Sequence, residues 1–142
     1  MTDPLTRIRI VVVDDHAAFR GGVVEVLASE PDIDVVGEGS SAAEAIEIVQ
    51  RERPDVVVLD MNMPGGGLAV VARLAAVCPE VTILLFTVVA DADQIQTAVD
   101  MGAGGYLQKG VTGAELLDAV RKVYTGSFFA SSSLVSEPRP EA

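Results

Sequence analysis

The chain alternates between short apolar runs and longer segments in which apolar residues recur every three or four positions. The short runs are rich in Val, Ile and Leu and are bounded by Pro, Gly or Asp, which is typical of strands buried on both faces of a parallel sheet. The longer segments have the spacing of amphipathic helices. The expected strands cover residues 8–13, 33–37, 56–60, 81–87 and 104–108.

The segments between these strands carry signals for where helices start and stop. The Ser-x-x-Glu pattern at Ser41 and the Thr-x-x-Glu pattern at Thr112 have the form of capping boxes, which satisfy free amides at a helix start. Pro79 stops the third helix, and Gly102 and Gly126 end the fourth and fifth. Strand and helix alternate five times, which predicts an α/β protein with a doubly wound, five-stranded parallel sheet.

Length and composition favour a single domain. The chain has 142 residues, of which 49% are hydrophobic and only 4% aromatic, so a stable core would be built from Val, Ala, Leu and Ile. We expect the domain to span residues 1–126 and residues 127–142, rich in Ser, Pro and charge, to form a linker or disordered tail. The lone Cys78 precedes Pro79 at a helix end and is expected to serve as small apolar packing.

Charge and hydropathy narrow the function classes. A formal net charge of −11 disfavours direct nucleic-acid binding by this segment and binding to anionic membrane surfaces. The first residues lack the apolar core of a signal peptide, and no apolar run reaches membrane-spanning length. We therefore expect a cytoplasmic location.

Reactive side chains stand where the expected strands end. Asp14 and Asp15 follow the first strand, Asp60 ends the third, Thr87 ends the fourth and Lys109 follows the fifth. The carboxyl ends of parallel strands share one edge of the sheet, so these groups should converge there. Two like charges about 4 Å apart repel by roughly 4 kcal/mol at an effective dielectric of 20, so three carboxylates need protons or a cation. Oxygen ligands with room for water favour Mg²⁺.

The same edge suits a phosphoryl group. A metal ion and the Lys109 amine would take anionic oxygens, the Thr87 hydroxyl would donate to a third, and a carboxylate would attack. Simpler interpretations exist for each residue alone: Asp60 ends a strand, Asp14 and Asp15 cap a helix, and Thr87 and Lys109 are ordinary polar groups. His16 has no neighbouring nucleophile or second ligand and is assigned no role.

Four motifs in this order resemble the receiver domain of bacterial two-component response regulators. They are VVVDDH at residues 11–16, LDMNMP at 59–64, FT at 86–87 and YLQK at 106–109, and the resemblance covers roughly residues 7–126. The sequence is most similar to the subgroup in which a LuxR-type helix-turn-helix DNA-binding domain follows the receiver. The resemblance implies a flavodoxin-like (βα)5 fold and a signalling function that controls an output domain in the regulation of transcription.

The resemblance also implies roles for individual residues. Asp60 would accept the phosphoryl group from a sensor histidine kinase or a small acyl phosphate. Asp15 would bind Mg²⁺ directly and Asp14 mainly through water, with the backbone carbonyl of Asn62 and Asp60 itself completing the ligands. The domain would catalyse only its own phosphorylation and slow dephosphorylation.

The remaining implied roles concern the switch. Lys109 and Thr87 would contact the phosphoryl oxygens, and inward movement of Thr87 would let Tyr106 change rotamer. Packing alone is an equally good interpretation of Tyr106, since an aromatic residue is expected on an edge strand. The implied partners are a sensor kinase and, on one face of the domain, a second copy of the chain.

Three departures from the family pattern put the reaction rates in question. The loop at Gly65-Gly66-Gly67 is one residue shorter than usual, and Val88 stands where relatives have a small residue. Gly110 follows Lys109 where many relatives have Pro, which makes a cis bond there costly.

Two other functions compete. A Mg²⁺-dependent aspartyl-phosphate hydrolase would need a second acid two residues after the nucleophile, and that position is Asn62. A degenerate receiver that binds partners without phosphorylation is disfavoured by the complete set of reactive residues. The subgroup's DNA-binding domain is absent, so we expect either a stand-alone receiver or a regulator cut in its linker.

Overall fold

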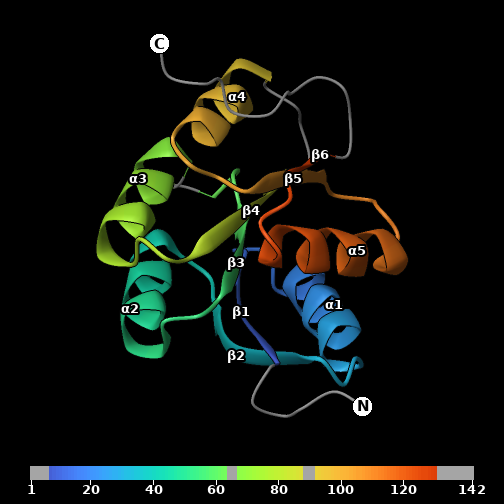
Figure 1. The fold of residues 1–142 in the computed structure, drawn as a ribbon. Coiled ribbons are helices and arrows are strands. Elements are labelled where there is room, and N and C mark those ends of the chain that lie inside the picture. Colours follow the sequence, from blue (N-terminus) through green and yellow to red (C-terminus); the bar gives the residue numbers. More distant parts are fainter. Residues whose placement is uncertain (1–6, 64–66, 88–91, 131–142) are drawn as a thin grey trace.

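The computed structural model describes residues 7–63, 67–87 and 92–130 (Figure 1). Its strands and helices alternate as the sequence predicts. The strands are β1 (Ile8–Val13), β2 (Ile33–Gly39), β3 (Val56–Asp60), β4 (Thr82–Thr87), β5 (Gly105–Gln108) and β6 (Phe129–Ala130). The helices are α1 (Ala17–Ala28), α2 (Ala42–Glu52), α3 (Leu68–Val77), α4 (Ala92–Asp100) and α5 (Gly113–Tyr124).

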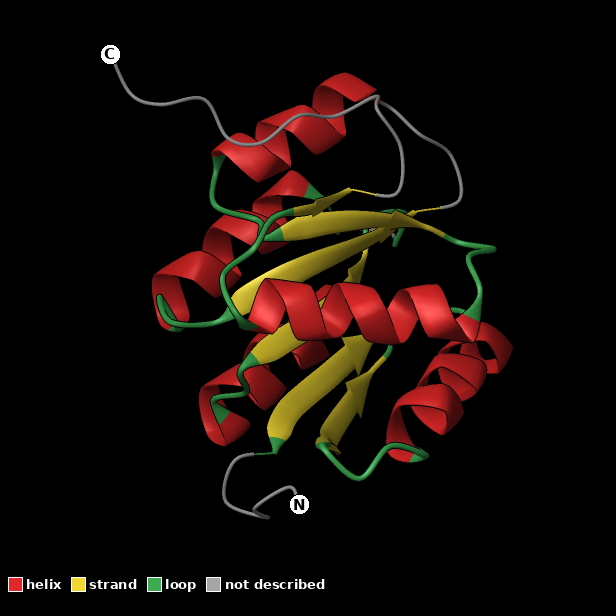
Figure 2. Cartoon of the chain, turned by 45° about the vertical axis from the view of Figure 1, so that its right-hand side comes forward, coloured by secondary structure: helices red, strands yellow, loops and turns green. Residues whose placement is uncertain are grey.

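All strand pairs are parallel, and the strands lie in the order β2-β1-β3-β4-β5-β6. Helices α1 and α5 cover one face of the sheet, and α2, α3 and α4 cover the other (Figure 1). Figure 2 shows the strands lying between these two helical layers. The predicted doubly wound α/β fold is confirmed.

The core explains why the central strands are continuous apolar runs. Alternate residues point to opposite faces, so Val57 and Leu59 pack under α2 and α3 while Val56 and Val58 pack under α1 and α5. Every residue of β3 is buried. Cys78 is fully buried in the same core, as expected for a small apolar group.

The two predicted capping boxes differ in the structure. At Thr112 both halves form, because the hydroxyl accepts from the Glu115 amide and the Glu115 carboxylate accepts from the Thr112 amide. At Ser41 the hydroxyl accepts from the Glu44 amide, but the Glu44 carboxylate turns to Ser40, whose amide donates to it at 2.8 Å. The predicted first residue of α4, Asp91, lies outside the described residues.

The prediction of five strands was one strand short. Phe129 and Ala130 form β6, which pairs with Gly105 and Tyr106 of β5, so β5 is not an edge strand. A two-residue strand has no alternation to reveal it in the sequence, and it lies in the segment that we expected to be a linker. Gly105 permits the pairing, because a Cβ there would lie 2.7 Å from the Phe129 carbonyl oxygen. Residues 131–142 lie outside the described part, so the domain boundary stays a prediction.

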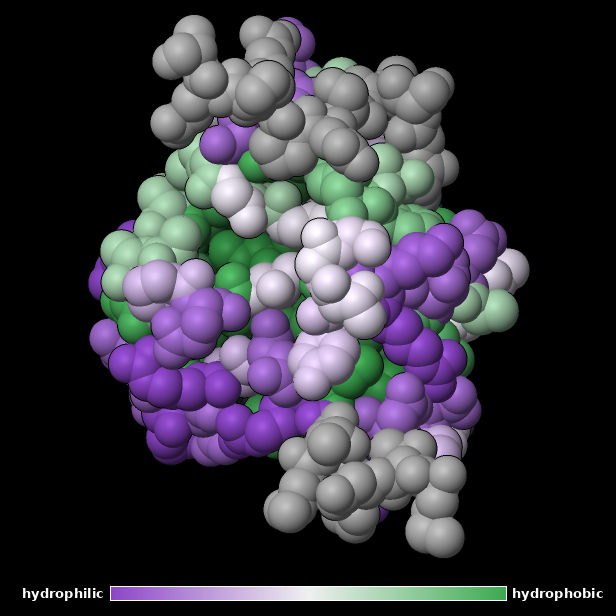
Figure 3. Space-filling model, in the orientation of Figure 1, coloured by the Kyte–Doolittle hydropathy of each residue, from purple (hydrophilic) through white to green (hydrophobic). Residues whose placement is uncertain are grey.

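The hydropathy of the molecular surface differs between neighbouring helices. In Figure 3, α2 at the lower left is hydrophilic, whereas α3 above it is more apolar, in agreement with its Val- and Ala-rich sequence. Among the described helices, none combines the length and the apolar character needed to cross a membrane.

Candidate functional site

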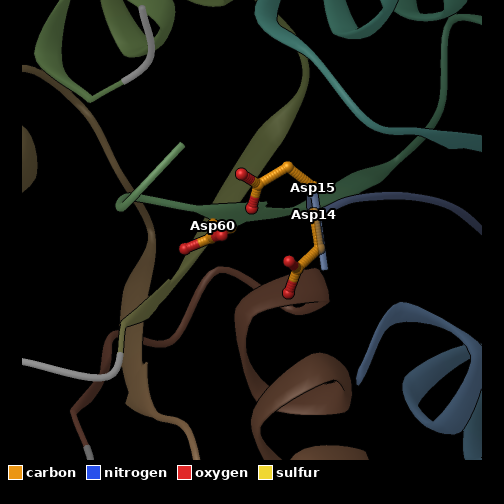
Figure 4. A group of neighbouring side chains, drawn as sticks. All are labelled: Asp14, Asp15 and Asp60. Atoms are coloured by element: carbon orange, nitrogen blue, oxygen red, sulfur yellow. The ribbon is translucent and has the colours of Figure 1, made fainter. Parts of the chain in front are cut away.

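The carboxyl ends of β1 and β3 bring three carboxylates together. Oxygen atoms of Asp14, Asp15 and Asp60 lie within 4.8 Å of one another (Figure 4). Asp14 and Asp60 are buried, with 3% and 2% of their surface exposed, whereas Asp15 is exposed to solvent. The convergence expected from the parallel topology is therefore present, and its open side is at Asp15.

Lys109 lies between the two buried carboxylates. Its Nζ is 2.8 Å from Asp14 Oδ2 and 3.4 Å from Asp60 Oδ2, and its side chain is only 9% exposed. The backbone amide of Lys109 donates to the Thr87 carbonyl oxygen at 2.7 Å, which joins the end of β5 to the end of β4. The backbone of Lys109, directly after β5, is therefore fixed to the neighbouring strand β4.

Burial dominates the electrostatics of Asp60. Desolvation raises the pKa of its carboxyl group, and the Asp14 charge acts in the same direction. A hydrogen bond from the Asn62 amide, 2.9 Å from Asp60 Oδ1, and the Lys109 ammonium oppose this effect without cancelling it. A positive ion at the site would favour the ionised form that a nucleophile needs.

Asp14 is held in place by hydrogen bonds and by its ion pair with Lys109. The His16 amide donates to Asp14 Oδ1 at 2.8 Å, and Lys109 binds the other carboxylate oxygen. The Arg20 guanidinium donates to the Asp14 carbonyl oxygen at 2.7 Å and to Glu38 at 3.3 Å. His16 therefore contributes its backbone amide to this part of the site.

Thr87 and Tyr106, the two residues expected to act as a switch, are both buried. Thr87 is 1% exposed, and its hydroxyl donates to Asn62 Oδ1 at 3.0 Å. Tyr106 is fully buried in the core beneath α3 and α4. The structure therefore places the Asn62 side chain against Thr87, a contact that the sequence did not predict.

Phe19 is a second residue that the sequence analysis missed. Its ring centroid lies 4.6 Å from Lys109 Nζ, and the ring packs edge-to-face on Phe86 with centroids 5.4 Å apart and planes at 88°. The available signal was the start of α1 directly after Asp15, which places the first helical turn at the same edge of the sheet.

Two of the departures from the receiver-family pattern lie outside the described residues. These are Val88 and the first two glycines of the Gly65–Gly67 loop. Gly67 is described and precedes α3 with a φ of 77°, a conformation that favours glycine. Gly110 has a φ of 105°, and the described peptide bonds are all trans.

The donor set can hold a hard cation. All three converging ligands are carboxylate oxygens, the donors that Mg²⁺ prefers, and the exposed Asp15 leaves a path for entry. The same space lies beside an ammonium group, so the site can bind an anion and a metal ion together.

Comparison with known proteins gives the family. The family model for the response regulator receiver domain matches residues 10–121. The chain is 38% identical over 120 residues to the DNA-binding transcriptional activator DevR/DosR of Mycobacterium tuberculosis, covering 84% of this chain and 55% of that protein. It is 36% identical over 124 residues to the transcriptional regulatory protein DegU of Brevibacillus brevis, covering 87% and 52%. The chain thus spans about half the length of these relatives.

Comparison with solved structures gives the same family. A LuxR-family two-component response regulator from Aurantimonas sp. SI85-9A1 superposes with a TM-score of 0.84 at 31% identity, covering 90% of this chain and 92% of that one. The receiver domain of the putative response regulator NarL from M. tuberculosis gives a TM-score of 0.80 at 36% identity, covering 84% and 98%. The resemblance seen in the sequence is confirmed, and the chain belongs to the response regulator receiver domain family.

Proposed function

We propose that this receiver accepts a phosphoryl group on Asp60 and changes conformation to control an output domain. The donor would be the phosphohistidine of a sensor histidine kinase or a small acyl phosphate. The observation that carries the proposal is the Lys109 ammonium seated between the buried carboxylates of Asp14 and Asp60, with Asp15 within 4.8 Å. This arrangement combines a nucleophile with groups that stabilise phosphoryl oxygens.

Asp14, Asp15 and Asp60, with the Asn62 carbonyl, are the residues that would hold Mg²⁺. The ion, when bound, would neutralise charge on the phosphoryl oxygens as they approach the carboxylates. An Asp60 oxygen would attack phosphorus while the bond from phosphorus to the donor nitrogen or oxygen breaks, and the electron pair of that bond would leave with the donor. The Asn62 amide holds Asp60 Oδ1, which orients the carboxylate for this attack.

The new phosphoryl group would change the contacts of the surrounding residues. Lys109 would exchange Asp14 for a phosphoryl oxygen, and the Thr87 hydroxyl would exchange Asn62 Oδ1 for another. Movement of Thr87 would then alter the packing of Tyr106. The added negative charge, close to two units, would bias an equilibrium between two conformations of the face formed by α4, β5 and α5.

The relatives suggest what the switch controls. DegU and DevR/DosR are transcriptional regulators of which this chain matches only about half the length, so we propose an output in transcription, reached through a separate DNA-binding part. The partners would be a cytoplasmic sensor kinase and a second receiver.

The competing functions receive less support. Asn62 lies where a hydrolase needs its second acid, and its side chain accepts from Thr87. A degenerate receiver would be expected to lack one of the reactive groups, whereas the three carboxylates and the amine lie together.

Incubation with Mg²⁺ and acetyl phosphate tests the proposal. We expect intact-mass spectrometry to show a gain of one phosphoryl group on the wild type and none on Asp60→Asn. Beryllium fluoride, which mimics the phosphoryl group, should shift the amide NMR signals of Thr87 and Lys109. If the wild type shows no mass gain and no spectral change, the result favours the alternative function, an interaction module that works without phosphorylation.

A further inference from the structure

We propose that Phe19 is a positioning residue for this reaction, because its ring holds the Lys109 ammonium toward the carboxylates by a cation–π contact. The inference rests on the proposed phosphorylation of Asp60. Phe19 lies in the first turn of α1, and its ring contacts the Lys109 ammonium. A helix that supplies none of the proposed reacting groups would therefore set the direction of the amine.

The geometry around Lys109 Nζ supports this role. The ammonium has Asp14 Oδ2 at 2.8 Å and Asp60 Oδ2 at 3.4 Å, and the Phe19 ring centroid lies at 4.6 Å. A cation above an aromatic face is attracted to it, and the attraction is larger when the cation is shielded from water, as it is here at 9% side-chain exposure. The ring accepts no strong hydrogen bond, so the three ammonium hydrogens stay available to oxygen atoms.

The ring is itself fixed toward the site. Its edge-to-face contact with Phe86 joins it to β4, next to Thr87, and the Phe86 carbonyl oxygen accepts from the amide that follows Asp60 at 2.9 Å. Behind the ring lies an apolar groove of about 260 Å³ between α1 and α5, lined by Val23, Val26 and Leu116 among others. The groove lets a smaller or larger side chain at position 19 be accommodated, so a variant can be made without disrupting the core.

The chain contains a matched control. Lys122 lies over the ring of Phe129, with 5.6 Å between Nζ and the centroid, but its side chain is 53% exposed and it pairs with Asp118 on the same helix. This second contact has the same chemistry, but Phe129 pairs with Gly105 at the amino end of β5, whereas the three carboxylates lie at the carboxyl ends of the strands. If a change of ring electronics at Phe19 acts through Lys109, the same change at Phe129 should have no effect on phosphorylation.

The test replaces Phe19 by phenylalanines with one, two and three ring fluorine atoms, which weaken the cation–π attraction in steps while the ring keeps nearly the same volume. We expect the rate constant for phosphorylation by acetyl phosphate to fall in the same order, by about 3- to 10-fold for three fluorines. The same series at Phe129 should leave the rate unchanged. Phe19→Leu should be at least as slow as the trifluoro variant, and Phe19→Tyr should retain the wild-type rate.

A spectroscopic measurement separates positioning from simple packing. Protons above an aromatic face are shifted upfield, so the Lys109 Hε signals should move downfield in Phe19→Leu and stay in place in Phe19→Tyr. If the wild type is phosphorylated and all fluorinated Phe19 variants react at the same rate, this inference is overturned and the proposed function stands. A wild type that takes up no phosphoryl group overturns the proposed function and this inference together.

Discussion

Two clusters in this domain have the same composition, one cation between two carboxylates, but different surroundings. Lys109 with Asp14 and Asp60 is buried, with side-chain exposures of 9%, 4% and 2%. Arg121 with Glu30 and Asp32 is partly exposed, at 40%, 32% and 27%, and joins α5 to the turn before β2. We call them the Lys109 cluster and the Arg121 cluster.

Burial gives these clusters opposite electrostatic consequences. In the Lys109 cluster, desolvation raises the pKa of Asp60 despite the neighbouring ammonium. In the Arg121 cluster, hydrogen bonds from the guanidinium lower the pKa of Asp32, and burial opposes them without cancelling them. We therefore expect the partly exposed Arg121 cluster to stabilise the fold, and we expect the fold to be more stable without the buried charge of Asp60. The proposed function accounts for its presence.

The largest expected difference is in phosphorylation. Asp60→Asn should lose all phosphoryl uptake from acetyl phosphate, because the amide is not a nucleophile. Asp32→Asn makes the same chemical change in the Arg121 cluster and should keep the wild-type rate. Intact-mass spectrometry over time measures both variants, and uptake by Asp60→Asn would place the modification on another residue.

The second difference is in stability after loss of the cation. Lys109→Met should lower the free energy of unfolding by about 3 kcal/mol, because it leaves two buried carboxylates unpaired. Arg121→Met should lower it by about 1 kcal/mol, since its carboxylates can be solvated. Urea unfolding without divalent ions measures both values. Equal losses would mean that burial does not distinguish the clusters.

The third difference is the direction in which pH changes the stability contributed by each cluster. Folded Asp60 keeps its proton to a higher pH than unfolded Asp60, so stability falls as the pH rises from about 4 through the raised pKa. Folded Asp32 loses its proton at a lower pH, so its contribution is present above about pH 4 and is lost as the pH falls through the lowered pKa.

Unfolding curves from mildly acidic to neutral pH can separate these effects. Near neutral pH, Asp60→Asn should be more stable than the wild type and Asp32→Asn less stable. Both differences should shrink toward acidic pH, the second only below about pH 4. A wild type more stable than Asp60→Asn at neutral pH would contradict the assignment of Asp60 as a destabilising charge.

The smallest difference concerns salt. Raising NaCl from about 0.1 M to about 1 M shortens the screening length from roughly 10 Å to 3 Å. The stability lost in Arg121→Met should then fall by about half, because the exposed cluster is screened. The loss in Lys109→Met should change little. Urea unfolding at both concentrations tests this, and an equal salt response would show that water reaches both clusters.

The sequence was sufficient for the parallel direction of the five longer strands and for the meeting of their carboxyl ends. Apolar runs buried on both faces require a parallel sheet, and parallel strands place Asp14, Asp60 and Lys109 at one edge wherever the helices lie. These predictions depend on strand direction alone, which explains why they agree with the structure. The roles of the residues in phosphoryl transfer and switching remain proposals.

The contacts that the sequence missed depend on how elements cross. Whether Phe19 faces Lys109 is set by the angle of α1 on the sheet, and spacing along the chain does not give that angle. The Arg121 cluster joins α5 to a turn that lies 89 and 91 positions earlier in the chain. The Ser-x-x-Glu pattern predicts that the Glu44 carboxylate accepts from the Ser41 amide, but it does not reveal the competing donor at Ser40.

The short strand β6 has a consequence for association between chains. An unpaired strand edge offers free amides and carbonyls to which a strand of another molecule can add. On the β5 side that edge is occupied by β6, whose two residues leave little backbone for such an addition. On the opposite side the seven-residue β2 carries the exposed acidic side chains of Asp34 and Glu38, which repel an approaching acidic copy. Both borders of the sheet are therefore poor templates for aggregation.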